Sequence, residues 1–204
     1  LVFFSVTEDS LRESGQGIVA RYANVPLAES DGKFTHLGAS ISYRWNADAD
    51  GTQFRTRPEI HTINDFYVDT GEIDAASEIA RISLAAARVS GRFSWQTELL
   101  GARVSRDGEP TADFHGAYVF ASWFLTNDQR NYDFGQGLFR RVKVSDPVGQ
   151  GGKGAFEIAG RISHVDLTDQ DIIGGIETNI SLGFNWYLND QFRVMTNLIK
   201  VLDV

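Results

Sequence analysis

The stretch Gly175–Leu188, GIETNISLGFNWYL, decides the fold of this chain. From Ile180 onward every second residue is apolar, with Trp186 near the end, and the residues between them are polar or small. A period of two places these sets on opposite faces of a β-strand. Broad apolar residues opposite Asn, Ser and Gly suit a transmembrane β-barrel, which turns its apolar face to lipid and a small polar face to a wet lumen.

Comparable runs recur along the chain, separated by Gly, Asn and Asp. Several exceed the common strand length of about 5–6 residues in soluble proteins and reach the roughly 9–11 that cross a bilayer obliquely. We therefore predict an all-β chain, a fragment of an antiparallel transmembrane β-barrel. The strands are expected near 1–8, 16–25, 34–45, 52–60, 63–70, 76–89, 92–104, 113–125, 153–166, 175–188 and 191–203.

Two stretches leave the assignment open. Residues 76–89 are rich in alanine and their charges have a spacing that also suits a helix; the tight Ser90-Gly91 link to the next strand favours a strand. Residues 127–152 hold either an extra hairpin or an irregular segment. The other connections are expected to alternate, as in bacterial barrels, between tight turns near 26–33, 90–91 and 189–191 and acidic loops near 46–51, 105–112 and 167–174.

Composition excludes several other classes of protein. Mean hydropathy is −0.21, and no window approaches the roughly 18 apolar residues of a membrane helix. Barrel strands need no such window, because only alternate residues face lipid. The absence of cysteine excludes a disulfide scaffold and thiolate metal sites. The net charge of −8 argues against nucleic acid as a partner.

The ends of the chain bear on its domain organisation. It opens in an apolar run, Leu1–Val6, and stops at Val204, inside or just after another strand-like run, and no signal peptide is visible. An open sheet edge cannot face lipid. We therefore expect residues 1–204 to be a partial outer-membrane barrel domain that lacks N-terminal strands and the final C-terminal strand or strands.

Charged residues decide which face of each strand lines the lumen, because an arginine facing lipid at mid-membrane costs about 2–4 kcal/mol. Guanidinium groups along a pore favour anions, although the same charges could instead pair across strands. Arg55 and Arg57, without an intervening acid, are the leading candidates. The expected inward cations are Arg21, Arg44, Arg55, Arg57, Arg92, Arg161 and Arg193, and the expected inward carboxylates are Glu59, Glu78, Glu98 and Glu157.

No catalytic or metal-binding constellation stands out. His36, His61, His115 and His164 share no metal-ligand spacing, and no Gly-x-Ser-x-Gly motif occurs. We expect no enzymatic activity, no metal and no cofactor. Two alternatives remain: a soluble β-sandwich or lectin-like binding module, whose apolar faces would pack together, and an outer-membrane enzyme, which needs a clustered nucleophile and base.

A series of short motifs spans most of the chain in one order. The motifs are HLGASISYRW (36–45), FRTRPE (54–59), VDTG (68–71), GRFSWQTE (91–98), AYVFASWFLT (117–126), GLFRRVKVSDP (137–147), GAFEIAGRISHVDLTD (154–169) and NISLGFNWYLNDQFRVMTN (179–197). Together they resemble the C-terminal half of the phosphate-selective porin O and P family.

This resemblance implies a sixteen-stranded, trimeric outer-membrane barrel that passes phosphate, polyphosphate or other small inorganic anions along lumenal arginines. By position in the Arg-Thr-Arg-Pro-Glu motif, Arg55 and Arg57 carry over, with Arg44 and Arg21 as companions. Arg161 completes the expected pore-lining set. The implied partners are the lipid bilayer, lipopolysaccharide, small anions and further copies of the chain, but not nucleic acid.

Overall fold

The computed structural model describes residues 2–5, 16–30, 32–45, 52–59 and 64–203, and all regular structure in these ranges is β-strand. Within them no helix is long and apolar enough to cross a membrane. The strands are β1 (Val2–Ser5), β2 (Gln16–Ser30), β3 (Lys33–Trp45), β4 (Thr52–Thr56), β5 (Val68–Ile73), β6 (Ala76–Ser90), β7 (Phe93–Arg106), β8 (Glu109–Phe124), β9 (Tyr132–Asp133), β10 (Leu138–Phe139), β11 (Ala155–Asp169), β12 (Ile172–Tyr187) and β13 (Arg193–Asp203).

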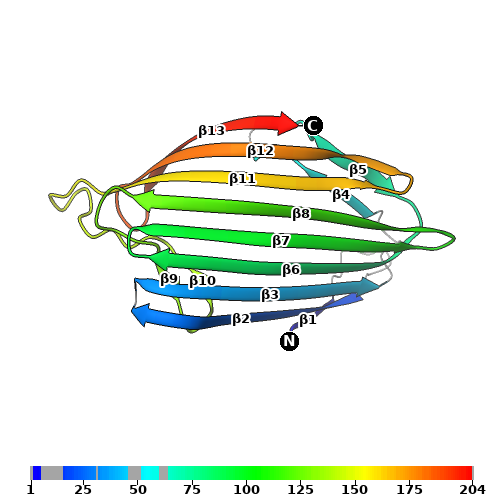
Figure 1. Ribbon diagram of the computed structural model, residues 1–204, viewed down its shortest axis with the longest axis horizontal. Coiled ribbons are helices and arrows are strands. Elements are labelled where there is room, and N and C mark those ends of the chain that lie inside the picture. The colour runs from blue at the N-terminus through cyan, green and yellow to red at the C-terminus, as the bar shows by residue number, and fades with distance from the viewer. Residues whose placement is uncertain (1, 6–15, 31, 46–51, 60–63, 204) are drawn as a thin grey trace.

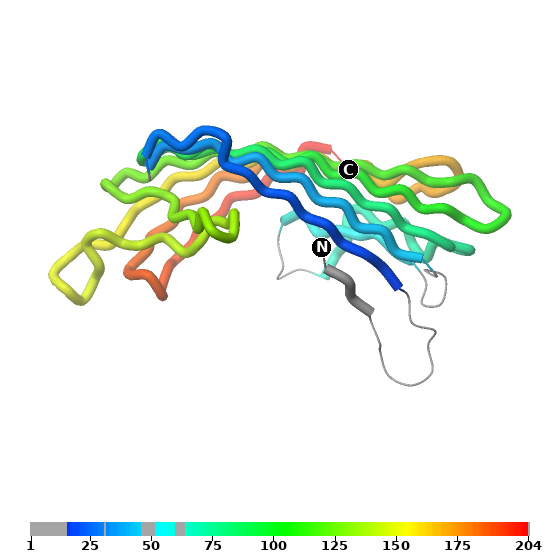
Figure 2. The backbone as a smooth tube through the Cα atoms, turned by 90° about the horizontal axis from the view of Figure 1, so that it is seen from below, coloured from blue at the N-terminus to red at the C-terminus, as the bar shows by residue number. Residues whose placement is uncertain are grey.

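Nine strands form one antiparallel sheet in the order β1-β2-β3-β6-β7-β8-β11-β12-β13 (Figure 1). Neighbours in this sheet follow one another along the chain, except where two segments leave it. The first inward segment (residues 52–59 and 64–75) carries β4 and β5, and the second inward segment (residues 125–154) carries β9 and β10. Figure 2 shows the sheet curved into a trough, with both segments beneath its concave side. The all-β, antiparallel fold is confirmed as an open curved wall with β1 and β13 at its edges.

The long strands of this wall were predictable, including the ambiguous one. Residues 76–89 lie in β6, which pairs with β3 on one side and with β7 on the other. The helix alternative is therefore wrong for this stretch. Its alanines are accommodated because two neighbouring strands satisfy the backbone of β6 on both sides, so that intrinsic propensity does not decide.

The expected alternation of tight turns with acidic loops is wrong. Strands β7 and β8 join at the Asp107-Gly108 turn, and β11 and β12 join at Gln170-Asp171, so that 105–112 and 167–174 are mostly strand. Gly108 and Gln170 have φ angles of 81° and 55°, the left-handed conformation that tight hairpin turns require. The expected loop 46–51 lies outside the described residues.

The convex face of the wall is mainly apolar and exposed. Leu182 and Ile41, both expected to face outward, are 59% and 55% exposed. Near one end, outward rings form two pairs: Phe93 with Trp123, at 6.1 Å between centroids, and Phe156 with Trp186, at 5.8 Å. Within the described part of the chain no element packs on this face (Figure 2). An apolar band with an aromatic rim suits lipid and disfavours the β-sandwich alternative.

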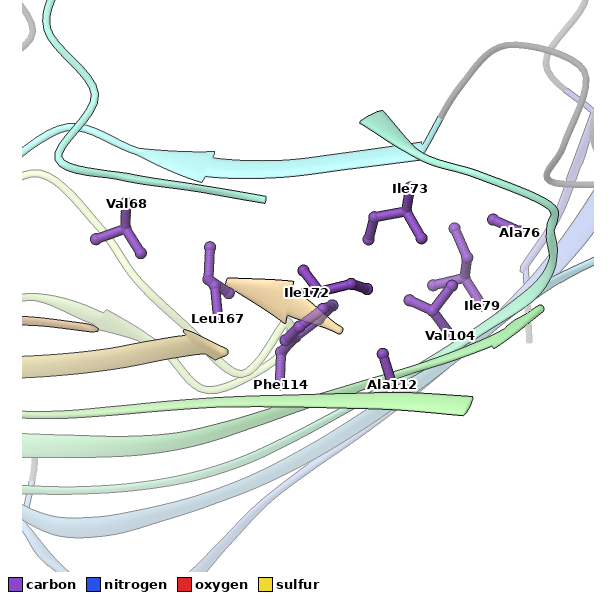
Figure 3. Packing of buried hydrophobic residues seen from close by; sticks show 9 residues of the cluster. All are labelled: Val68, Ile73, Ala76, Ile79, Val104, Ala112, Phe114, Leu167 and Ile172. Carbon is purple, nitrogen blue, oxygen red and sulfur yellow. The ribbon is translucent and has the colours of Figure 1, made fainter. Parts of the chain in front are cut away.

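Buried hydrophobic residues lie on the concave side, under the two segments that leave the sheet. The first segment packs on wall residues of β6, β7, β8, β11 and β12 in one cluster (Figure 3). The second segment packs Tyr132 against Phe34 and Val89, and Val142 against Phe124 and Ala155. These contacts fix both segments against the wall, where they can present side chains to the space inside the trough.

Candidate functional site

Arg55 and Arg57 are carried by the first inward segment rather than by a wall strand. The expected strands near 52–60 and 63–70 are present in part, as β4 and β5, but their expected place in the barrel wall is wrong: β4 pairs only with β5, and neither joins the main sheet. Successive side chains of β4 point to opposite sides, which explains why Arg55 does not face the wall. Phe54 faces the wall and its ring lies 5.4 Å from that of Phe114, whereas Arg55 is exposed on the opposite side.

The two guanidinium groups share one aromatic neighbour. The Cζ atoms of Arg55 and Arg57 lie 4.3 and 4.7 Å from the centroid of the Phe66 ring. Asp69 is directly across from Arg55 in the ladder, but its Oδ1 accepts hydrogen bonds from Gln53 and from the Gly71 N–H. Neither arginine has a carboxylate ion pair among the described residues. Stacking covers a guanidinium face and leaves its N–H edge available to an anion.

Arg161, another expected pore-lining residue, lies on the concave side of β11 and is already paired. Its Nε is 3.2 Å from Oε1 of Glu59, and its Cζ lies 4.3 Å from the centroid of the Tyr118 ring. Glu59 also accepts hydrogen bonds from Ser163 and Ser181 on the wall, at 2.5 and 2.6 Å. Because Glu59 offsets its charge, Arg161 presents less net positive charge on the concave side than Arg55 or Arg57.

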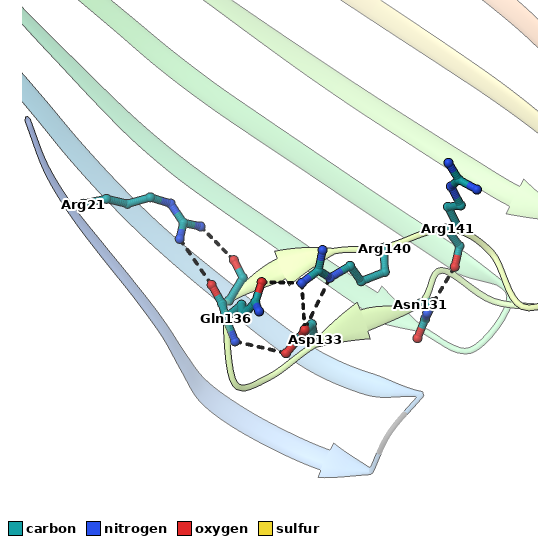
Figure 4. A network of polar contacts seen from close by, with 7 residues as sticks. Arg21, Asn131, Asp133, Gln136, Arg140 and Arg141 are labelled. Atoms are coloured by element: carbon teal, nitrogen blue, oxygen red, sulfur yellow. Dashed lines mark hydrogen bonds and ion pairs between the residues drawn. The ribbon is translucent and has the colours of Figure 1, made fainter. Parts of the chain in front are cut away.

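Arg21 and Arg44 also face the concave side, in different settings. Nη2 of Arg21 donates to the carbonyl of Gly137 at 2.7 Å, which ties β2 to the second inward segment (Figure 4). Arg44 lies on β3, two positions beyond Ser42, and Ser42 is directly across from Arg81 of β6. Arg44 and Arg81 are thus neighbouring cations on one face, and Arg81 was missing from the expected set.

The prediction that the side chains of Glu78 and Arg92 point to the lumen is wrong. Glu78 lies directly across from Trp45 of β3 and Ser105 of β7, with its side chain on the outward face. The inward and outward positions of β6 are therefore shifted by one residue from those expected. Arg92 lies in the turn after β6, and its Cζ is 5.7 Å from the centroid of the outward Trp123 ring. Local charge alone could not fix these phases, since a shift of one residue turns every side chain of a strand to the other face.

The second inward segment adds cations that sequence analysis missed. A cavity of about 300 Å³ is lined by Arg130, Arg140 and Arg141 of this segment, together with Arg193 of β13, which was expected to face inward; Asp190 is its carboxylate. Nη1 of Arg130 donates to Gln96 at 2.8 Å, and burial lowers the pKa of this guanidinium. Apolar and polar residues do not alternate in 127–152, so the sequence did not show which side chains of this stretch face the lumen. The run Arg140-Arg141-Val142-Lys143 was the available signal for a basic patch.

This second segment contains both of the structures that sequence analysis left open. It is irregular, with a minimal hairpin of β9 and β10. Arg140 donates to Asp133 at 3.0 Å, and this bond lowers the pKa of the Asp133 carboxyl (Figure 4). The Tyr132 hydroxyl lies 2.6 Å from Nδ1 of the buried His36. The segment is thus held to the wall by polar as well as apolar contacts.

Tyr132→Phe is expected to loosen this segment without unfolding the wall. Removing the hydroxyl leaves buried His36 without this partner, which costs about 1–3 kcal/mol, while the ring keeps its packing against Phe34. Amide hydrogen exchange should accelerate in residues 126–153 and stay unchanged in β7. Tyr67→Phe, at a ring 42% exposed, serves as the control. Unchanged exchange in Tyr132→Phe would show that the hydroxyl is not a tether.

No group of three or more His, Asp or Glu is placed to hold a metal ion in the ranges that the structure describes. The polar groups of the concave face are guanidinium groups, carboxylates, hydroxyls, amides and the buried His36 imidazole. Its cations lie on β2, β3, β6, β11 and β13 and on both inward segments. Such an arrangement can attract and briefly hold small anions in water.

Comparison with known proteins is consistent with this geometry. The family model for phosphate-selective porin O and P matches residues 2–202. An uncharacterized protein of Caulobacter vibrioides is 35% identical over 167 residues, which cover 79% of this chain and 33% of that protein. Porin O of Pseudomonas aeruginosa is 24% identical over 225 residues, covering 95% of this chain and 49% of Porin O. The chain therefore spans half or less of the length of these relatives.

Proposed function

The chain belongs to the phosphate-selective porin O and P family, whose members are bacterial outer-membrane proteins, and we propose that it forms part of a passive channel for small anions such as phosphate. The wall would separate lipid from water, and the inward segments would narrow the lumen. No chemical step is involved. The channel lowers the barrier to entry by replacing part of the hydration of an anion with guanidinium groups.

One observation supports the proposed preference for anions. Arg55 and Arg57 project from the first inward segment with their faces against Phe66 and with no carboxylate ion pair in the described residues. A guanidinium stacked on a ring is held in place, so that less conformational freedom is lost when an anion binds its edge. Arg44 and Arg21 on the wall, and to a lesser degree Arg161, would extend the positive potential along the anion path.

We further propose that residues 1–204 are part of a larger barrel. The described sheet has β1 and β13 as edges, and unpaired backbone groups cannot face the hydrocarbon of a bilayer. Additional strands would pair with both edges and close the barrel, sixteen-stranded as the family resemblance implies. A homotrimer in contact with lipopolysaccharide is part of the same proposal, with the apolar convex face in the membrane.

The test is electrical. The complete protein that contains this chain is inserted in a planar bilayer under a KCl gradient, and the reversal potential is recorded with and without phosphate. We expect anion selectivity and block of the chloride current by phosphate at concentrations on the order of millimolar or below. Selectivity for cations would refute the anion path while leaving the barrel intact.

A further inference from the structure

A second feature of the concave face does not fit a channel for inorganic anions alone. A cavity of about 570 Å³ lies between the wall and the first inward segment. Its lining is mostly apolar, although a lumen filled with water is expected to be polar. The side chains that give it this character come from several wall strands and from β4, and include Val19, Phe54, Leu100, Ala102, Phe114 and Val165.

The charges of this cavity are few and are separated. Arg81 is exposed toward it, with its Cζ 5.4 Å from the centroid of the Phe54 ring. Within the described ranges Arg81 has no carboxylate ion pair, and Arg44 adds positive charge beside it. Glu98 belongs to a different row of the wall and accepts a hydrogen bond from Ser83. One end of the cavity is therefore cationic, and apolar surface lies next to it.

This composition is typical of sites for small organic molecules. Such sites have volumes of about 300–1,000 Å³ and are mainly apolar, with a few polar groups that fix orientation. A bare inorganic anion at Arg81 would leave the apolar lining in contact with water, which is unfavourable in proportion to the exposed apolar area. A neutral apolar molecule would leave the Arg81 guanidinium without an acceptor. A molecule with both an acid group and an apolar body satisfies both.

We propose that this cavity binds a small aromatic or bulky aliphatic carboxylate, with the acid group on Arg81 and the body against Phe54, Leu100 and Phe114. Leu100 is 47% exposed on the concave side, so its side chain is available for such contact. Glu98 sets the orientation, because it repels the acid group from the opposite end. The site lies beside the path proposed for inorganic anions and adds a second class of solute to it.

The test compares three probes on the complete protein in planar bilayers. Benzoate carries both features of the proposed ligand, acetate only the acid group, and benzamide only the apolar ring. We expect benzoate to reduce the KCl conductance by half at a concentration at least about tenfold below that of acetate, with benzamide without effect. Equal potency of benzoate and acetate, or equal potency of benzoate and benzamide, would overturn the proposal.

Two variants on different strands locate the effect. Arg81→Gln should raise the half-blocking concentration of benzoate at least about tenfold, and Leu100→Ala about fivefold. Leu99→Ala, at the adjacent outward-facing leucine that is 56% exposed, should leave it unchanged. Benzoate block that survives both cavity variants would overturn the site. The reversal potential in KCl alone, measured in the same bilayers, reports separately on the proposed anion channel.

Discussion

Replacing Arg55 and Arg57 together with alanine is expected to weaken phosphate block at least about tenfold and to move the reversal potential toward cations. Hydrogen bonds from charged donors contribute about 1.5–3 kcal/mol each when desolvated, and about 1.4 kcal/mol corresponds to a tenfold change in affinity. Arg55 is exposed, so screening by water reduces its share. Even after this reduction, the loss of two guanidinium groups that have no ion pair within the described residues should weaken the block more than about tenfold.

The pairing of Arg161 provides a comparison for this prediction. Arg161→Gln removes a charge that Glu59 already offsets at 3.2 Å, so its effect on phosphate block should be several times smaller. Arg92→Gln, at the turn beside outward Trp123, should have none. If Arg161→Gln weakens the block as much as the double variant does, the wall rather than the inward segment determines anion affinity.

Why the wall could be predicted is clear from β12. Its residues alternate between Ile180, Leu182 and Phe184 on the convex side and Asn179, Ser181 and Gly183 on the concave side. Alternation with a period of two can be seen in the local sequence. The cost of placing charge in lipid then indicates which face points outward and which points to the lumen. The same reasoning correctly placed Glu98 on β7 and Arg161 on β11 at the concave face.

The inward segments could not be predicted in the same way. Thr52–Thr56 has the alternation of a strand, and nothing in these residues says whether their partner is a wall strand or β5. That choice depends on packing with residues distant in sequence, such as Phe114 and Leu167. Residues 127–152 lack an alternating pattern because they bend between contacts with several wall strands, among them β3, β6, β8 and β11. The place of Arg130 in the candidate site could therefore be identified only from the tertiary structure.

Glu78 illustrates a different limit. Strand β6 has alanines on both faces, so its pattern contains little information about phase. The phase is set by its neighbours: Ile82 is directly across from Ile41 of β3, and Leu84 from Leu99 of β7, all of them outward. Because cross-strand pairs on one face stabilise a sheet, these apolar contacts outweigh the cost of placing Glu78 on the outward face near the end of the strand.

The phase of β6 predicts the largest effect of a single substitution on membrane insertion. Leu84 lies near the middle of β6, 50% exposed on the convex face. Leu84→Arg would place a guanidinium in hydrocarbon near the midplane, which costs about 2–4 kcal/mol. We expect the complete protein to fold into lipid vesicles poorly, with the midpoint of urea unfolding lowered accordingly. Retention of the folded form can be followed by its mobility on gels without heating.

Ala85→Arg is the matched control, because it adds the same side chain one residue further along the same strand. Ala85 faces the concave side, directly across from Glu98 on β7, so the new guanidinium would meet water and an opposite charge. It should cost little or even stabilise the barrel by a few tenths of a kcal/mol. Equal losses from the two variants would mean that the convex face does not meet lipid, and a larger loss from Ala85→Arg would mean that lipid and lumen are exchanged. Because both variants share charge, size and strand, only the environment of the two faces can separate them.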